Sequence, residues 1–247
     1  MSLRDAKLRS LPPSVCALGA TAKAVDATGN RLSSLPAELS ALTTIQRLVL
    51  SSNALATAPP VLWSLTTLKV LALDGNALTQ LPAGLAELKK LEKLSVADNK
   101  LSSLPEALGE LSSLKSLSVA GNAVTQLPDA LGACTYLEEL DASRNGLASV
   151  PASMGKLTRL RVLNLDANRI TRIPAEVLQG CTALVTLSLH ENPIDIQAME
   201  EVPGWADMQG RIQGKNAKRV AGGVMLGDRG LDDGIDHSLT RVIVPHT

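Results

Sequence analysis

The sequence predicts an α/β solenoid, in which stacked chain repeats form a curved parallel β-sheet, or horseshoe, with a helical cap at its C-terminal end. Two regularities in the 247 residues predict it. Asparagines recur in steps of 23 residues, with a last step of 24, at Asn30, Asn53, Asn76, Asn99, Asn122, Asn145, Asn168 and Asn192. Prolines also step by 23 residues, at Pro36, Pro59, Pro82, Pro105, Pro128, Pro151 and Pro174. A fixed period in this range is the signature of a solenoid.

Each unit begins with a short strand that has one buried face. In the unit that contains Asn99, Leu94 and Val96 alternate with Lys93, Ser95 and Ala97. Successive side chains of a strand point to opposite faces, so the two apolar residues are expected inside and the other three outside. The same alternation precedes every asparagine of the series.

The asparagine and the proline are expected to shape the rest of each unit. An inward-facing Asn99 amide can both donate to and accept from backbone groups of its own and the adjacent coil, which would otherwise be buried without partners. Each proline fixes φ at the start of the return segment, where its missing N–H costs nothing. Leucines such as Leu108 and Leu111 then bury the convex side.

Both ends of the array are atypical, as expected of terminal repeats. We assign residues 1–193 to the array, a partial N-terminal repeat followed by about eight repeats, with one extra residue in the last unit around Gly180 and Cys181. Residues 194–221 are predicted to form capping helices, with Trp205, Met208 and Ile212 on one face covering the last repeat. Residues 222–247 are predicted to be an extended or partly ordered tail.

Composition argues against several classes of partner. Lys plus Arg and Asp plus Glu both number 24, which gives no electrostatic reason to expect nucleic acid or an anionic membrane. No apolar run is long enough to span a bilayer, and the N-terminus has neither a signal core nor a Met-Gly start. Cys134 and Cys181 stand two repeats apart, too far for a disulfide. We therefore predict a soluble protein of the cytoplasm.

Several segments carry a resemblance to a known family. They are residues 3–8, 180–184, 189–194, 204–205, 225–227 and 230–236. The chain resembles intracellular leucine-rich repeat proteins related to Ras-group binders, and more narrowly those grouped with leucine-rich repeat-containing protein 57 and its plant and algal relatives. The resemblance implies a non-enzymatic binding scaffold. The chain departs from it in lacking the N-terminal Met-Gly of several relatives, and in having Ala or Val at several core leucine positions.

The outward side chains of the strands form the expected ligand surface of such a solenoid, its concave face. Its centre, at Ser116 and Ser118, is small and uncharged, while its C-terminal half is acidic, which indicates a partner with a basic, protruding element. It has no aromatic side chain to serve as an anchor. The candidate protein-binding residues are Arg47, Ser51, Asp74, Lys93, Ser95, Asp98, Ser116, Ser118, Glu139, Asp141, Arg144, Asn164, Asp166 and His190.

Two further groups have alternative interpretations. Arg211, Lys215, Lys218 and Arg219 form a candidate second contact for an acidic surface or a phosphate, but a solvated helix face paired with the tail aspartates is favoured. Trp63 and Tyr136 fall on the return side. A Trp that packs over a neighbouring turn is favoured there over a convex-face anchor.

Nothing in the sequence indicates catalysis. The histidines His190, His237 and His246 lie apart from any plausible nucleophile, and no phosphate loop or metal-ligand cluster appears. We therefore expect no cofactor, metal or small-molecule substrate, and predict a cytoplasmic adaptor or scaffold that binds a protein partner. Two alternatives stay open: a regulator that binds a Ras-like GTPase or a phosphatase, and a structural subunit of a large cytoskeletal or ciliary assembly.

Overall fold

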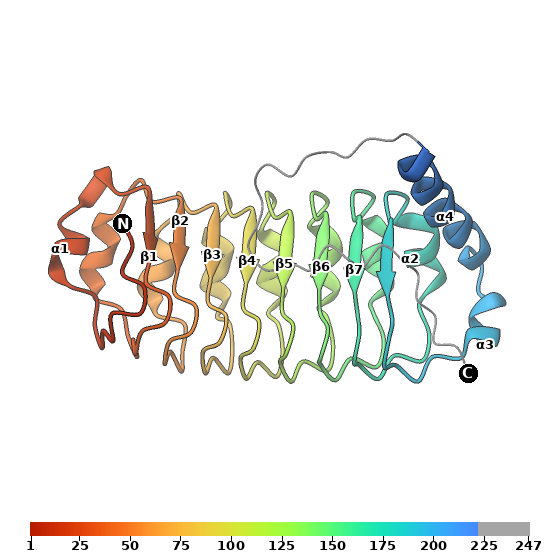
Figure 1. Cartoon of the computed structure of the whole chain (residues 1–247), viewed down its shortest axis with the longest axis horizontal. Helices are drawn as coiled ribbons and strands as arrows, with labels where there is room; N and C mark the ends of the chain where they lie inside the picture. The colour runs from red at the N-terminus through yellow and green to blue at the C-terminus, as the bar shows by residue number, and fades with distance from the viewer. Residues whose placement is uncertain (222–247) are drawn as a thin grey trace.

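Eight short strands form one open parallel sheet in a computed structural model that describes residues 1–221, without the side chains of residues 196 and 214–221. The strands follow one another in sequence order along the molecule (Figure 1). They are β1 (Ala24–Asp26), β2 (Arg47–Val49), β3 (Val70–Ala72), β4 (Lys93–Ser95), β5 (Ser116–Ser118), β6 (Glu139–Asp141), β7 (Val162–Asn164) and β8 (Thr186–Ser188). The predicted parallel solenoid is confirmed.

The middle residue of every strand points into the core. Neighbouring strands pair without a shift, so that these residues stack in one column from Val25 through Leu94 to Leu187. All of them are at most 2% exposed. Leu94 and Val96 are buried while Lys93, Ser95 and Ala97 are partly exposed, which confirms the predicted alternation. One aliphatic core therefore runs the length of the array.

Each proline of the series is followed at once by a short helix on the far side of the sheet (Figure 1). In the 23-residue repeats this helix is 3₁₀, in η2 (Ala37–Ala41), η3 (Pro60–Ser64), η4 (Ala83–Glu87), η5 (Glu106–Glu110), η6 (Asp129–Ala133) and η7 (Ala152–Lys156). The unit with one extra residue forms an α-helix instead, α2 (Ala175–Gly180). A 3₁₀ turn takes fewer residues than an α turn, so the added residue permits the wider helix.

The asparagine amides join consecutive turns as predicted. The Asn99 Nδ2 group donates to the carbonyls of Val96 and Ala97 in its own turn and of Leu73 in the preceding repeat, all at 3.0 Å. Its Oδ1 accepts from the Leu78 N–H, also at 3.0 Å. The same pattern of three carbonyls and one N–H is repeated at Asn30 and Asn192, near the two ends of the array.

The first residues of the chain complete the N-terminal end. The Met1 amine donates to the Ala24 carbonyl at 2.8 Å, and Ser2 forms a parallel bridge with Asp26. Two short helices follow, α1 (Pro13–Cys16) and η1 (Gly19–Thr21). Leu11 and Val15 are buried against the first full repeat, so this partial unit extends the core.

Two helices close the C-terminal end, α3 (Ile196–Glu200) and α4 (Trp205–Ala221). Trp205, Met208 and Ile212 are at most 2% exposed and belong to the same core, as their spacing predicts. Asp195 caps α3 by accepting from the N–H groups of residues 197 and 198. Figure 1 shows α4 across the last repeat. The predictions for residues 222–247 lie outside the described part of the chain.

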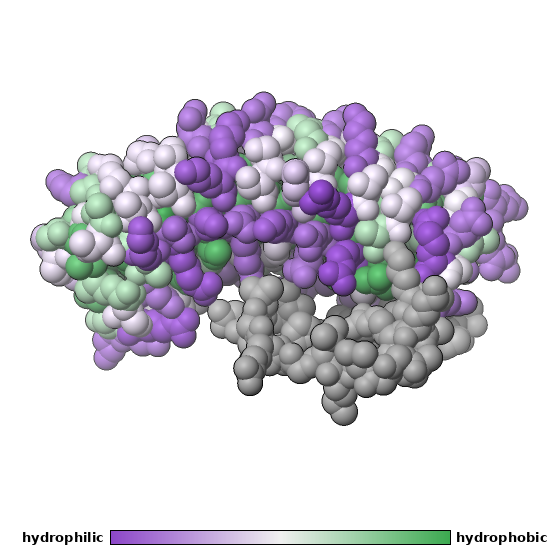
Figure 2. Space-filling view, turned by 90° about the horizontal axis from the view of Figure 1, so that it is seen from above, coloured by the Kyte–Doolittle hydropathy of each residue, from purple (hydrophilic) through white to green (hydrophobic). Residues whose placement is uncertain are grey.

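A row of side chains with alternating charge runs along the edge at which the strands begin. Figure 2, which views the molecule from above, shows a hydrophilic band along the array that includes this row. Glu92 pairs with Lys115 at 2.7 Å and with Lys69 at 3.1 Å, each one repeat away. Hydrogen bonds from Lys115, then from Lys69, lower the pKa of the Glu92 carboxyl. Sequence analysis did not predict this row. Because its members are about one third to one half exposed, its contribution to stability is small.

Cys16, Cys134 and Cys181 are all free and buried, which agrees with the prediction that Cys134 and Cys181 are too far apart for a disulfide. The Cys134 thiol donates to the Leu108 carbonyl at 3.2 Å, and the Cys181 thiol to the Met154 carbonyl at 3.3 Å. Burial raises the pKa of both thiols to about 11, and the charge of Arg211 partly opposes this at Cys181. These thiols are inert core groups.

Replacing Asn99 by Ala is expected to lower the free energy of unfolding by about 3 kcal/mol or more, because it leaves several buried backbone groups without partners. Asn164→Ala is the matched control. Asn164 is partly exposed, and its side-chain oxygen accepts one N–H, from Asp166 at 3.1 Å, so about 1 kcal/mol should be lost. Urea unfolding followed by circular dichroism measures both. Equal losses would contradict the structural role of Asn99.

Stability should also fall in alkali. The pKa of the Cys134 and Cys181 thiols is raised from 9.0 to about 11 in the folded chain, so their protonation stabilises the fold below about pH 9. This contribution, about 2–3 kcal/mol for each thiol, is lost as the pH rises through about 11. The double variant Cys134→Ala, Cys181→Ala should be less stable at neutral pH but decline less steeply in alkali. Parallel curves in urea titrations at several pH values would refute this.

The concave face of the sheet as a candidate protein-binding surface

The structure brings all fourteen predicted binding residues onto one face of the sheet, in four columns that run across the repeats. The first two columns contain the outward residues of the strands: Arg47, Lys93, Ser116 and Glu139, then Ser95, Ser118, Asp141 and Asn164. The third lies two residues beyond the strands and holds Ser51, Asp74, Asp166 and His190. The fourth, which we call the rim, directly precedes the asparagines and holds Asp98 and Arg144. We call the four columns together the concave face.

Every rim residue has a left-handed backbone. Its φ is 51° at Asp98, 53° at Arg144, 52° at Ala167 and 54° at Glu191, and the glycines Gly29, Gly75 and Gly121 hold the same place in other repeats. The chain needs this conformation to turn the next residue, the asparagine, inward. An L-residue adopts it at a cost of about 1–2 kcal/mol. Sequence analysis missed this feature, whose signal is the glycine at three of the rim positions.

Acidic residues of the second column cap their own strand ends. Asp141 Oδ1 accepts from the N–H of Ser143 at 3.1 Å and from its hydroxyl at 2.8 Å. Asp26 does the same for Thr28, at 3.0 and 2.6 Å. These carboxylates therefore already have partners within the chain.

Acidic residues of the third column join neighbouring repeats. Asp166 Oδ1 accepts from the Ser188 hydroxyl and from the His190 N–H, both at 2.7 Å. Asp74 makes the equivalent contacts with the Ser95 hydroxyl and, at 2.9 Å, with the Ala97 N–H. Some of the carboxylates on this face therefore stabilise the fold. The exposed carboxylates of Glu139 and Glu191, by contrast, make no side-chain hydrogen bond within the described part of the chain.

The Ser188, His190 and Asp166 side chains lie together without the geometry of a nucleophilic site. The Ser188 hydroxyl donates directly to Asp166 and lies 3.3 Å from His190 Nδ1. His190 Nδ1 is 3.6 Å from Asp166 Oδ1. Ser188 is only 3% exposed. A histidine base would have to stand between the serine and the carboxylate, so this arrangement joins two repeats rather than activating a nucleophile.

An ion pair crosses the rim above Gly121. Arg144 Nη2 lies 3.0 Å from Asp98 Oδ1, although the two residues belong to repeats on either side of Gly121. A Cβ at Gly121 would meet that carboxylate oxygen and would lie 3.3 Å from Arg144 Nη2. The glycine therefore leaves the space through which the two side chains reach each other.

The two aromatic candidates on the return side behave differently. Trp63 is partly buried and packs over Gly84, where a Cβ would approach its ring to 2.9 Å, so the favoured packing interpretation holds. Tyr136 is 46% exposed, and the guanidinium of Arg159 lies 4.2 Å from its ring centre. Its neighbour on the next repeat therefore covers part of one face of the ring.

The candidate second contact on α4 is only partly described. The Arg211 guanidinium donates to the Leu178 carbonyl near the end of α2, so this side chain ties the cap to the last repeat. Lys215, Lys218 and Arg219 lie on the same helix, but their side chains fall outside the described residues, as do the tail aspartates. The surface role of this group stays a prediction.

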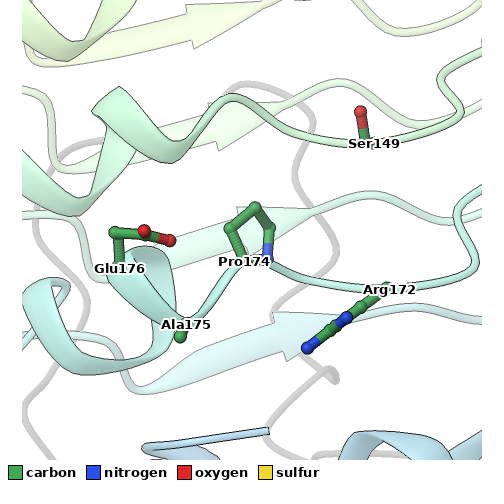
Figure 3. Close-up of a pocket in the computed structure, with 5 residues that line it drawn as sticks. All are labelled: Ser149, Arg172, Pro174, Ala175 and Glu176. Carbon is green, nitrogen blue, oxygen red and sulfur yellow. The ribbon is translucent and has the colours of Figure 1, made fainter.

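The surface depression near the start of α2 does not bring reactive side chains together. Figure 3 shows this shallow depression, lined by Ser149, Arg172, Pro174, Ala175 and Glu176. In this view the charged groups of Arg172 and Glu176 lie on opposite sides of Pro174. Among residues 1–221 no group of His, Cys, Asp and Glu side chains is placed to hold a metal ion. No helix within the same residues is long and apolar enough to cross a membrane.

Comparison with known proteins agrees with the repeat geometry. The family model described as "Leucine rich repeat" matches residues 66–124 and 135–194. A leucine-rich repeat protein from Leptospira interrogans superposes with a TM-score of 0.78 at 32% identity, over 83% of this chain and 51% of its own. The chain is a leucine-rich repeat protein. Domains of this kind generally mediate protein–protein interactions and are generally not enzymes.

Other similar proteins come from varied settings. A plant intracellular Ras-group-related LRR protein from Oryza sativa subsp. japonica is 36% identical over 60 residues, 24% of this chain and 23% of the relative. The ectodomain of the Arabidopsis thaliana membrane receptor kinase GASSHO1/SCHENGEN3, in complex with CASPARIAN STRIP INTEGRITY FACTOR 2, has a TM-score of 0.62 at 31% identity, over 70% of this chain and 21% of its own. The chain thus spans about a quarter of the curated relative, about half of the Leptospira chain and about a fifth of the Arabidopsis ectodomain.

Gly121→Ala is expected to open the Asp98–Arg144 ion pair, because the new methyl group displaces the Asp98 carboxylate. Gly75→Ala is the matched control, since Gly75 has φ 61° against 63° at Gly121 and an added Cβ there lies 3.4 Å from its nearest neighbour, Ser52 Oγ. Both variants should lose about 1 kcal/mol of stability from the strained φ. Only Gly121→Ala should change the NMR signals of the Arg144 guanidinium. Unchanged signals would refute the crossing.

Proposed function

We propose that the protein is a non-enzymatic adaptor or scaffold that binds a protein partner on its concave face. The supporting observation is the contrast between the columns of each repeat. The inward columns keep nearly the same residue, as in the buried series from Leu48 through Leu71 to Leu163. The first concave column changes at every step, through Arg47, Val70, Lys93, Ser116 and Glu139. Regularly spaced side chains that differ from repeat to repeat form a surface that can recognise one particular partner.

The partner is expected to carry a basic element opposite the C-terminal half of this face. Asp141 and Asp166 accept hydrogen bonds within the chain, so reversal of their charge would disturb the fold as well as the partner. Glu139 and Glu191 are exposed and lack such bonds in the described chain. Substitution of these two glutamates is therefore expected to change partner binding with the least effect on folding.

A second candidate function is favoured by one relative. The similarity to a plant intracellular Ras-group-related protein supports a regulator that binds a Ras-like GTPase. It also supports the proposal that the protein is located in the cytoplasm. Binding of a purified Ras-like GTPase that changes with its bound nucleotide would select this regulator. Binding that is equal in the GDP and GTP states would leave the constitutive scaffold.

Affinity capture from the cells that make the protein tests the proposal. We expect a set of proteins that wild type retains and that the variant Glu139→Lys, Glu191→Lys loses at least about tenfold. Glu87→Lys with Lys156→Glu on the return side is the control, because both residues are exposed on the helices η4 and η7. Circular dichroism should show all three chains equally folded. Partners that are lost with the return-side control but kept by the concave variant would overturn the proposal.

A further inference from the structure

The concave face has a distinct centre at the repeat that contains β5. Its four concave-face positions hold Ser116, Ser118, Ala120 and Gly121, which carry no charge and little bulk; Ala120 is almost fully covered, at 4% exposed. The repeats on either side carry charges at both ends of their columns: Lys93 and Asp98 on one side, Glu139 and Arg144 on the other. We call this strip of small side chains along β5, together with the charged side chains of the repeats on either side, the trough: β5 is its floor and the charged side chains are its walls.

The hydroxyls on this floor differ from those elsewhere on the face. In other repeats Ser51, Ser95, Ser143 and Ser188 each donate to a carboxylate within the chain. The hydroxyls of Ser116 and Ser118 make no hydrogen bond to any residue between 1 and 221, although both are partly exposed. A hydroxyl both donates and accepts, so this pair can serve the N–H and C=O groups of an incoming backbone.

The two ends of the trough differ in their ion pairs. At the rim the walls are joined across Gly121 by Asp98 and Arg144, 3.0 Å apart. At the other end Lys93 and Glu139 stand on either side of Ser116, and no ion pair joins them in the part of the chain that is described. The trough is thus closed at the rim, and where the strands begin it presents a cation and a carboxylate that have no ion-pair partner among residues 1–221.

We propose that this trough binds an extended segment of a partner protein, which lies along β5 and places an acidic side chain against Lys93 and a basic one against Glu139. Successive side chains of an extended chain point in opposite directions, so two neighbouring residues reach the two walls. The partner residues nearest the rim must be small, because the Asp98–Arg144 pair closes the trough above Gly121 and Ala120 is only 4% exposed. The inference rests on the proposed concave-face function and names the chemistry of its partner.

Selection from a phage-displayed library of short random peptides tests the trough. Wild type should select peptides with neighbouring acidic and basic residues followed by small ones. The exchange variant Lys93→Glu, Glu139→Lys keeps the net charge and should bind these peptides at least about tenfold more weakly. Exchange of the acidic and basic residues in the peptide should restore binding. Ser118→Tyr fills the floor and should abolish binding, whereas Glu87→Lys with Lys156→Glu should leave it unchanged.

Other outcomes separate the trough from the broader function. The selected peptides could still bind the exchange variant and Ser118→Tyr but fail to bind Glu191→Lys or Arg47→Glu. That result would overturn the trough proposal but would still support binding elsewhere on the concave face. Peptides that tolerate every concave variant would count against both. Failure to select any peptide from the library would overturn the trough, and the capture experiment would then decide the broader function alone. Circular dichroism of each variant shows whether a loss comes from unfolding.

Discussion

The whole array depends on the way in which one amide side chain satisfies the backbone of two consecutive turns. Stacked turns with short strands leave carbonyl and N–H groups buried at every bend, and a buried group without a partner costs about 1–3 kcal/mol. Asn99 donates to three such carbonyls and accepts from one such N–H. An aspartate could accept but not donate, and a leucine could do neither. The period of the asparagines is therefore the period of the solenoid.

Because the buried backbone groups find their hydrogen-bond partners inside the array, each repeat has positions that must stay constant and positions that can vary. The inward leucines and the asparagine cannot change without cost, because they make contacts both within a turn and between turns. The side chains of the concave residues contact only neighbouring repeats or their own strand end, as Asp74 contacts Ser51, Ser95 and the Ala97 N–H. The same repeat thus supplies a rigid frame and a face on which chemistry varies, which explains how one fold serves many partners.

Period and alternation were enough to predict the frame. The steps of the asparagines and prolines fixed the strands, the parallel order and the buried columns, and Trp205 with Met208 and Ile212 predicted the face of the cap that is buried. The chemistry of the face was only partly predictable. All fourteen candidate residues lie on it, yet nothing in the sequence showed that Asp141 caps Ser143 or that Asp166 binds Ser188 and His190.

The reason is geometric, and the pair above Gly121 shows it. A sequence gives the column of a residue through its phase in the repeat, but a contact between columns depends on the size of whatever stands between them. Asp98 and Arg144 meet because the intervening residue lacks a side chain, while Lys93 and Glu139 stand apart with Ser116 between them. On a face without aromatic anchors, such differences between small residues decide which charges remain available. If the concave face binds the partner as proposed, its specificity therefore depends on its smallest side chains as much as on its charged ones.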